Sequence, residues 1–287
     1  VPAVVKARSV IVGTLARQPL AKFRGETKIT ADPWMYRTST RQAPRTRMLW
    51  TLDDLIFHGV SLWAVERGAS GQITDAVRVP PEWWEVDDDL RVLVNGVEVS
   101  NDEVLLIEGP QDGLLDIAAG TIRGARSMDR TWTSRVESPV PLTELHGTDP
   151  NDQLTDDEAE ALVQAWDKAR RQGGTAYTPP GIEARMHGDI VADLFTSGRN
   201  MLRLDIANFL GLPASLLEGS TATASLTYST KQDSRNELVD LSLAYWANPI
   251  EARLSQDDVV PRGQRVAFDL EYLTTPTQPA QGPAHED

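Results

Sequence analysis

Cysteine is absent from the 287 residues of this chain. Its absence excludes disulfide bonds, thiolate catalysis and zinc sites built on cysteine. Long apolar runs are missing as well: runs such as Val10–Val12 and Val104–Ile107 fall far short of the roughly 20 residues that a membrane-spanning helix needs. The sequence therefore predicts neither a disulfide framework nor a transmembrane segment.

Signatures of common enzymes are also missing. The chain has no G-x-x-x-x-G-K-[ST] phosphate loop, no G-x-S-x-G nucleophile elbow and no H-E-x-x-H metal motif. Its four histidines are scattered without metal-ligand spacing: His58, His146, His187 and His285. We therefore expect no catalytic residue, no metal and no cofactor.

The composition is that of a folded protein, since 40% of the residues are hydrophobic and 24% are charged. The net charge of −14 is spread unevenly: residues 1–47 carry ten Lys/Arg and two acids (+8), and residues 51–110 carry three Arg and thirteen acids (−10). Affinity for phosphate comes mainly from Lys and Arg, so such an acidic chain is a poor static binder of nucleic acid. Two interpretations stay open: a surface past which DNA slides without adhering, and acidity that keeps the protein soluble.

Apolar periodicity predicts a mixed α/β unit over residues 1–110. A helix is expected over 2–18, and the polar, basic stretch 25–47 is expected to be a loop. A second helix is expected to begin at Thr51, with Asp53 and Asp54 in its first turn, and to end before Gly59. Strands are predicted at Leu20–Phe23, Ser61–Glu66, Ala76–Val79, Trp83–Val86, Arg91–Val94, Val97–Val99 and Val104–Ile107, with a tight hairpin at Asn95-Gly96.

Two long helices are predicted around a small separate unit. The first has an apolar stripe that begins at Leu114 and ends before Pro139; the second runs from Asp189 to Phe209. Residues 139–188 between them are expected to form a small α/β unit, whose helix begins at a capping box of Thr155 and Glu158.

Residues 218–230 lack a helical period and are rich in Ser, Thr and Ala, which is typical of a flexible loop. A long helix is expected to follow as far as about Gln256, kinked at Pro249. A final hairpin is expected over 259–273, and the Pro-rich residues 274–287 are expected to be a disordered tail.

Three acidic clusters, Asp53-Asp54, Asp87–Asp89 and Asp156–Glu158, admit two interpretations. They suit a hard-metal or nuclease site, but consecutive side chains on one element splay apart and rarely converge on one ion. We favour helix N-termini for the first and third clusters and a solvated turn for the second. Trp83 and Trp84 are expected on opposite faces of one strand, where either is a candidate for a subunit contact or an ordinary core anchor.

The order of these segments resembles the portal proteins of tailed bacteriophages, in the long-tailed lineage with the common capsid fold. The resemblance covers roughly residues 2–273, and its most specific part is Ile206–Pro213 followed by Leu216-Leu217. The other matching segments are Val1–Val4 with Pro19-Leu20, Leu55–Gly59 with Val60–Val65, Asp112–Leu114 and Asn248–Glu251.

The resemblance implies an α+β portal fold. Residues 1–110 and 231–273 would form a mixed α/β wing that contains the long kinked helix. Residues 111–138 and 189–213 would be two stem helices, 139–188 a small α/β clip, and 214–230 the tunnel-loop region. The family assembles as a ring of twelve, which implies a homo-oligomer with double-stranded DNA passing through its channel.

The same resemblance implies functional residues. Asp189, Asp193, Arg199, Arg203 and Asp205 are candidates for the channel lining of the stem; the two arginines would contact phosphates or, as we prefer, acids of the neighbouring subunit. Asp156, Asp157 and Glu158 would face the packaging motor from the clip. Residues of the tunnel loop would flex around the moving duplex, although an ordinary surface connector fits equally: Glu218, Gly219, Ser220, Thr221, Ala222, Thr223 and Ser225.

The implied function is DNA packaging and ejection through a virion capsid vertex, with assembly in the host cytoplasm. The implied partners are the large terminase subunit, the major capsid protein and the head–tail adaptor, with no membrane. The basic N-terminal region would meet an acidic capsid or scaffold partner or DNA, or simply carry solvated charge. Two alternatives are a metal-dependent enzyme acting on nucleic acid and a different head–tail connector ring protein.

Overall fold

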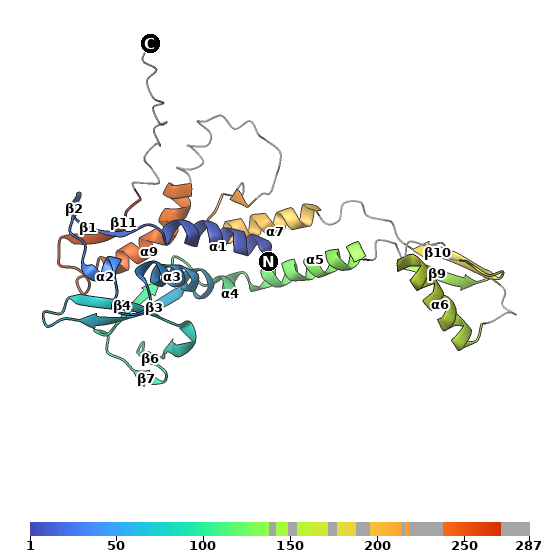
Figure 1. Ribbon diagram of the computed structural model, residues 1–287, viewed down its shortest axis with the longest axis horizontal. Helices are drawn as coiled ribbons and strands as arrows, with labels where there is room; N and C mark the ends of the chain where they lie inside the picture. Colours follow the sequence, from blue (N-terminus) through green and yellow to red (C-terminus); the bar gives the residue numbers. More distant parts are fainter. Residues whose placement is uncertain are drawn as a thin grey trace, which may run out of the picture. The chain divides into compact units, whose positions relative to one another are not determined.

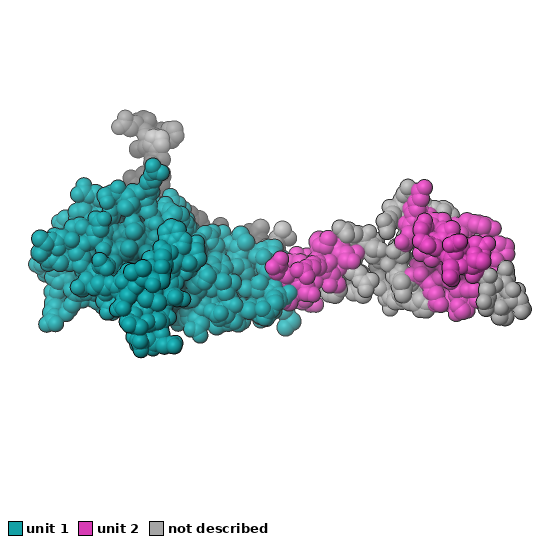
Figure 2. Space-filling view, turned by 90° about the horizontal axis from the view of Figure 1, so that it is seen from below, with its two compact units in different colours: residues 1–123, 200–287 teal, residues 124–199 magenta. Residues whose placement is uncertain are grey.

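The computed structural model describes residues 1–137, 142–148, 154–171, 177–187, 196–213, 216–217 and 238–270. They divide into two compact units, one of residues 1–123 and 200–287 and the other of residues 124–199 (Figure 2). We call them unit 1 and unit 2 and describe each by itself.

Unit 1 is built around the antiparallel sheet β4-β3-β8, formed by β3 (Val60–Arg67), β4 (Ile73–Val79) and β8 (Val104–Glu108) (Figure 1). The alternation of side chains divides its residues between two cores. Trp63 and Ile107 join the main core, whereas Leu62 and Val104 pack in a smaller one. Both faces of this sheet are therefore covered.

Helices α2 (Pro33–Tyr36) and α3 (Pro44–His58) pack on the main-core face of the sheet, and α1 (Pro2–Leu15) packs on α3. Each has proline in its first turn, where a missing N–H costs nothing. Helix α3 ends at Gly59, whose φ of +77° provides the left-handed cap. The prediction of a helix start at Thr51 is wrong by almost two turns, because Pro44 opens the helix and the side chain of Arg47 is buried in its first turn.

The predicted loop at 25–47 is also wrong for much of its length, since it contains β2 (Thr27–Ile29), α2 and the start of α3. Strand β2 pairs with β1 (Leu20–Arg24), and β1 pairs on its other side with β11 (Gln264–Phe268). The predicted C-terminal hairpin is therefore incorrect: Gly263 does lie in a turn, but β11 finds its partner at the other end of the chain.

The smaller core is covered by a second sheet, β5-β6-β7, made of β5 (Trp84–Val86), β6 (Val92–Val94) and β7 (Val97–Glu98). The predicted hairpin is confirmed by the pairing of Val94 with Val97. Trp83 lies in the short 3₁₀ helix η1 (Pro81–Trp83) and not in a strand, so the prediction that Trp83 and Trp84 share a strand is wrong.

The C-terminal part of unit 1 contains the π-helix η3 (Leu238–Leu243), which continues into α9 (Ala244–Leu254). Pro249 lies inside α9, as predicted, while residues 229–237 of the predicted helix lie outside the described residues. The main core includes Trp246 and Ile250 of α9 together with Leu15 of α1 and Leu55 of α3. The two ends of the chain thus build one core.

The predicted helix from Leu114 is interrupted once. Helix α4 (Leu114–Ile117) ends at Ala118, and α5 (Ala119–Glu137) begins at the next residue and continues into unit 2. Unit 2 also holds β9 (Leu142–Gly147), α6 (Asp156–Arg171) and β10 (Ile182–His187). The predicted pairing of strands on either side of its helix is confirmed, since β9 and β10 pair antiparallel.

Candidate functional site

The candidate docking and channel residues that the structure describes lie on α6 and α7 (Thr196–Phe209). Helices α5 and α7 touch within unit 2. The guanidinium of Arg199 lies 4.8 Å from the centre of the Trp132 ring, and one of its nitrogens lies 3.7 Å from a carboxylate oxygen of Asp129. A Cβ at Gly198 would lie 2.9 Å from Cε of Met128, so this glycine allows close approach of the two helices.

The end of α7 is fixed in unit 1 by its own apolar face. Ile206, Ala207 and Leu210 are fully buried in the main core. Trp246 donates a hydrogen bond of 3.0 Å to the carbonyl of Leu210, and Gln111 donates one of 2.6 Å to that of Phe209. The motif that resembles the portal family most specifically therefore belongs to the packing of unit 1.

A left-handed residue terminates α7. Gly211 has a φ of +62°, and the N–H of Leu212 bonds back to the carbonyl of Ala207 over 2.9 Å, as in a helix-ending Schellman motif. This explains why the sequence signal at Gly211 and Pro213 located the end of the helix correctly. Its predicted beginning at Asp189 lies outside the described residues.

Three of the predicted channel residues are described. Arg199 has its acidic partner, Asp129, inside the same chain, and Arg203 donates a hydrogen bond of 3.1 Å to Asn200. Asp205 is exposed. The other predicted channel and tunnel-loop residues lie outside the described residues: Asp189, Asp193, Glu218, Gly219, Ser220, Thr221, Ala222, Thr223 and Ser225.

The predicted docking residues open α6 of unit 2. Asp156, Asp157 and Glu158 occupy its first turn, where they face the partial positive charge of the helix terminus. The Glu158 carboxylate accepts hydrogen bonds from the N–H of Thr155 (3.0 Å) and from its hydroxyl (2.7 Å), and these bonds lower the pKa of Glu158. The predicted helix start is thus confirmed, and the three carboxylates are exposed.

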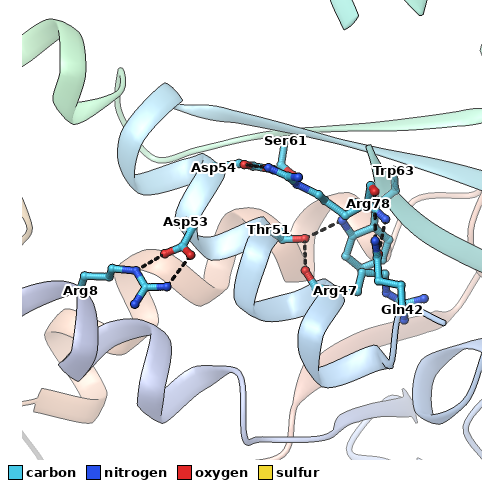
Figure 3. Close-up of polar contacts among 9 residues, drawn as sticks. All are labelled: Arg8, Gln42, Arg47, Thr51, Asp53, Asp54, Ser61, Trp63 and Arg78. Atoms are coloured by element: carbon cyan, nitrogen blue, oxygen red, sulfur yellow. Dashed lines mark hydrogen bonds and ion pairs between the residues drawn. The ribbon is translucent and has the colours of Figure 1, made fainter. Parts of the chain in front are cut away.

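The acids of the other two clusters form ion pairs with arginine. In the turn Asp87–Asp89, the guanidinium of Arg91 lies 2.8 Å from Asp87 and 3.0 Å from Asp89, so the predicted solvated turn is confirmed. The prediction for Asp53 and Asp54 is wrong: both lie within α3, Asp53 paired with Arg8 of α1 and Asp54 with Arg78 of β4 (Figure 3). Spacing along the sequence gave no signal for either pairing, because the partners are distant in the chain.

Within the described residues, no three His, Asp or Glu side chains gather as a metal site. Among the helices of those same residues, none combines the length and apolar character needed to cross a membrane.

Comparison with known proteins gives a consistent result. The sequence model for phage portal proteins matches residues 2–281. A solved structure, an HK97 family phage portal protein from Corynebacterium diphtheriae, is 30% identical with a TM-score of 0.79, covering 97% of this chain and 96% of that one. No curated protein sequence matches.

Two structures of lower identity share the fold. The neck of an empty gene transfer agent particle, computed with C6 symmetry, gives a TM-score of 0.66 at 16% identity, covering 94% of this chain and 81% of that one. The neck of the native particle, computed with C12 symmetry, gives 0.61 at 13% identity with the same coverage. With the family match extending over nearly the whole length, the chain belongs to the phage portal protein family.

Proposed function

We propose that copies of this portal protein close into a ring of twelve at one capsid vertex and conduct double-stranded DNA during packaging and ejection. The observation that carries the proposal is the match to a portal structure over nearly the full length of both chains. The necks with C6 and C12 symmetry support a cyclic assembly for chains of this fold.

In this proposal residues 1–110 and 231–273 form the wing, 111–138 and 189–213 the stem, and 139–188 the clip. Helices α5 and α7 belong to the stem, and their contact through Met128, Trp132 and Arg199 supports a helix pair that moves as one element. Residues 214–230 form the tunnel loop around the duplex. The predicted tail, residues 274–287, lies outside the described residues.

Repulsion of phosphate by the stem is the proposed physical basis of conduction. A ring repeats each acid of one subunit around the channel, so a few carboxylates create a strongly negative lining. The exposure of Asp205 supports a place on that lining. Asp189 and Asp193 are proposed to join it. Because Arg199 already has Asp129 as a partner, we assign it first to the stability of the stem, with contact to a neighbouring subunit as a second role.

The clip is proposed to dock the large terminase subunit and then the head–tail adaptor through the exposed acids that open α6. The wing is proposed to meet the major capsid protein. Charge reversal by Asp156→Lys and Asp157→Lys should weaken capture of the terminase, and Glu158 is left in place because it caps α6. Glu183→Lys on β10 is a control for charge reversal at one other exposed acid of unit 2.

Electron microscopy and native mass spectrometry of the purified protein test the ring. The expected result is annular particles with a central hole and a mass of twelve 31.6 kDa chains. A protein that stays monomeric at every ionic strength, alone and with its scaffold and capsid proteins, contradicts the proposal. Unchanged terminase capture by the Asp156 and Asp157 variant contradicts the docking role alone.

A further inference from the structure

The small sheet β5-β6-β7 of unit 1 and the segments next to it carry exposed apolar side chains and many acids. Trp83, Val86, Leu90 and Val97 are all exposed, although each is a large apolar residue. Six acids and a single arginine lie within residues 82–98, a net charge of −5. We call this surface the acidic face; its acids are Glu82, Glu85, Asp87, Asp88, Asp89 and Glu98.

Leu90 is the most unusual residue of the acidic face. Its side chain is 84% exposed, and its φ of +61° lies in the left-handed region that favours glycine. The turn bonds Leu90 N–H to the carbonyl of Asp87, and Asp87 N–H to the carbonyl of Arg91, a three-residue hairpin loop that requires this conformation. Neither solubility nor folding explains a leucine there, whereas an apolar contact does.

A groove runs beside this turn. It has a volume of about 890 Å³, and its walls include Val86, Leu90, Leu106 and Ile117, with the carboxylate of Glu108 beside them. A groove lined by apolar side chains and by the acids Glu108 and Asp112 fits a segment that carries aromatic or aliphatic side chains between basic ones.

Unit 1 carries such a segment on another surface. Arg17, Arg37, Arg41 and Arg45 are exposed, and none of them has an acidic partner within the described part of the chain. Tyr36, beside Arg37, is 59% exposed. Arg17, Tyr36 and Arg45 line one shallow hollow. We call this surface the basic face.

The basic face is held in place by the edge of the central sheet. Thr38 and Ser39 donate hydrogen bonds to the carboxylate of Asp75 on β4. The side-chain amide of Gln42 both accepts from the N–H of Arg78 (2.6 Å) and donates to its carbonyl (3.2 Å). The segment from Arg37 to Ala43 is therefore fixed against the free edge of β4, and its arginines have a defined place.

The two faces lie on different sides of the β4-β3-β8 sheet. Trp34 of α2 and Met48 of α3 pack with Trp63 in the main core, whereas Val92 of β6 packs with Leu62 in the smaller core. Figure 1 shows the same separation, with α2 and α3 on one side of β3 and β4, and β6 and β7 on the other. Two complementary surfaces that point in different directions cannot meet within one chain, but they can meet between copies.

We propose that the basic face of one subunit docks on the acidic face of the next, so that each contact in the ring is head-to-tail and electrostatically matched. The inference rests on the proposed ring and names its contact. A contact between two different surfaces of the same chain is the kind that closes into rings. A second copy fits better than DNA, because the exposed apolar residues of the acidic face suit the Tyr36 ring of the basic face and not a phosphate backbone.

Charge reversal tests each face separately. The acidic-face variant carries Glu82→Lys, Glu85→Lys and Asp88→Lys; the basic-face variant carries Arg37→Glu, Arg41→Glu and Arg45→Glu. All six side chains are exposed and make no ion pair within the described residues, so both monomers should fold. Each variant should need at least about tenfold more protein for half-assembly, measured by mass photometry, because like charges then face each other.

A sharper test combines the two sets of reversals, either in one chain or by mixing the two variants. A chain with all six reversals carries +1 on residues 82–98 and −2 on the four basic-face positions, so the faces again have opposite signs and assembly should be regained in part. An equimolar mixture of the two single-face variants should form mixed rings in which the variants alternate. A mere loss of folding predicts neither rescue. The six reversals together restore the net charge of −14, so alternation in the mixture is the result that separates a matched contact from a general effect of net charge.

The control exchanges Asp257 and Arg262, an exposed ion pair between α9 and β11 that belongs to neither face; it should leave assembly unchanged. If the unchanged protein forms rings and both triple variants form them equally well, the inference is overturned while the proposed function stands. If duplex DNA binding is lost in the basic-face variant and ring assembly is not, that face belongs to DNA and the inference is again overturned. If the unchanged protein never forms rings, the proposed function itself fails.

Discussion

The carboxylate of Asp54 is held in the interior of unit 1 by the guanidinium of Arg78, whereas Asp53, one residue earlier in α3, pairs at the surface with Arg8 (Figure 3). Ser61 donates a further hydrogen bond of 2.8 Å to Asp54. Burial raises the pKa of Asp54, and its bonds to Arg78 and Ser61 act in the opposite direction. Two adjacent aspartates thus join α3 to two different elements, β4 and α1.

Truncation of Asp54 and of Asp53 to alanine should lower the free energy of unfolding by very different amounts. Asp54→Ala leaves the guanidinium of Arg78, whose side chain is only 14% exposed, buried without its partner, a loss of about 3–5 kcal/mol. Asp53→Ala removes a half-exposed pair, a loss of about 1 kcal/mol or less. Urea unfolding followed by circular dichroism measures both. Equal losses would contradict the assignment of Asp54 to the interior.

Asp75 makes the stability of unit 1 depend on pH. Burial raises the pKa of this carboxyl, but hydrogen bonds from Ser39, Thr38 and the N–H of Ala76 outweigh it, so its pKa lies below the usual value. The unfolded chain binds the proton first, near pH 3.9. The stabilisation is therefore complete above about pH 5 and is lost as the pH falls through the depressed pKa of the folded state.

The direction of this pKa shift fixes the expected result. Asp75→Asn should be less stable than the unchanged protein at pH 7, and the gap between their urea midpoints should narrow below about pH 4. Asp88→Asn, an exposed carboxylate of the acidic face, is the control and should show no gap at either pH. A gap that stays constant down to pH 3 would show that the Asp75 side chain does not act through its charge.

Local patterns predicted local structure well. Asn95-Gly96 predicted a hairpin, Thr155 with Glu158 predicted the start of α6, and Gly211 predicted the end of α7; each signal acts within a few residues. The errors arose where the partner is distant. Nothing near Asp54 points to Arg78, and nothing near Gln264–Phe268 points to β1, because long-range pairing leaves no periodic trace in one sequence.

The candidate site divides in the same way. The motif Ile206–Pro213 could be recognised because its apolar residues pack in the main core and its glycine caps a helix. The proposed roles of Arg199, Arg203 and Asp205 depend on which groups of DNA and of neighbouring subunits face them in a ring. The local sequence of one chain holds no signal for those groups. The pairing of Arg199 with Asp129 and Trp132 was likewise not predicted, although both partners belong to the predicted first stem helix.

Gly59 and Gly113 mark a close backbone crossing where α3 ends and α4 begins. A Cβ at Gly113 would lie 2.3 Å from the carbonyl oxygen of Phe57, and backbone atoms cannot yield as a flexible side chain does. Gly113→Ala should therefore cost about 1–3 kcal/mol of unfolding free energy. Gly120→Ala, in open space on α5, should instead stabilise by about 0.5–1 kcal/mol. Thermal unfolding of both variants should give shifts of opposite sign, and a shared sign would contradict the crossing.

The cation–π contact between Arg199 and Trp132 should be measurable as local stability of the stem helices. Arg199→Met keeps much of the length of the side chain but removes its charge, and should lower the protection of α5 and α7 against hydrogen exchange by about 1 kcal/mol. Arg203→Met, two residues before Asp205 on the same helix, should stay within about 0.5 kcal/mol because its partner is the neutral Asn200. An equal loss of protection in both variants would contradict a special role of Arg199.

We expect Leu90 to destabilise the folded monomer and to stabilise the contact between subunits. Replacement by glycine separates these two effects. A leucine in the left-handed region costs about 1–2 kcal/mol, and the extra freedom of glycine in the unfolded chain takes back about 0.5–1 kcal/mol. Leu90→Gly should therefore stabilise the monomer by about 0.5–1 kcal/mol while it removes an apolar contact of the acidic face and weakens ring assembly. Asn95→Gly, at a φ of +51° that asparagine tolerates, should bring no gain in stability. Misfolding would lower both the stability of the monomer and its assembly, so only a specific contact explains a variant that is more stable and assembles worse. A variant that is more stable and assembles normally would leave Leu90 without a role between subunits.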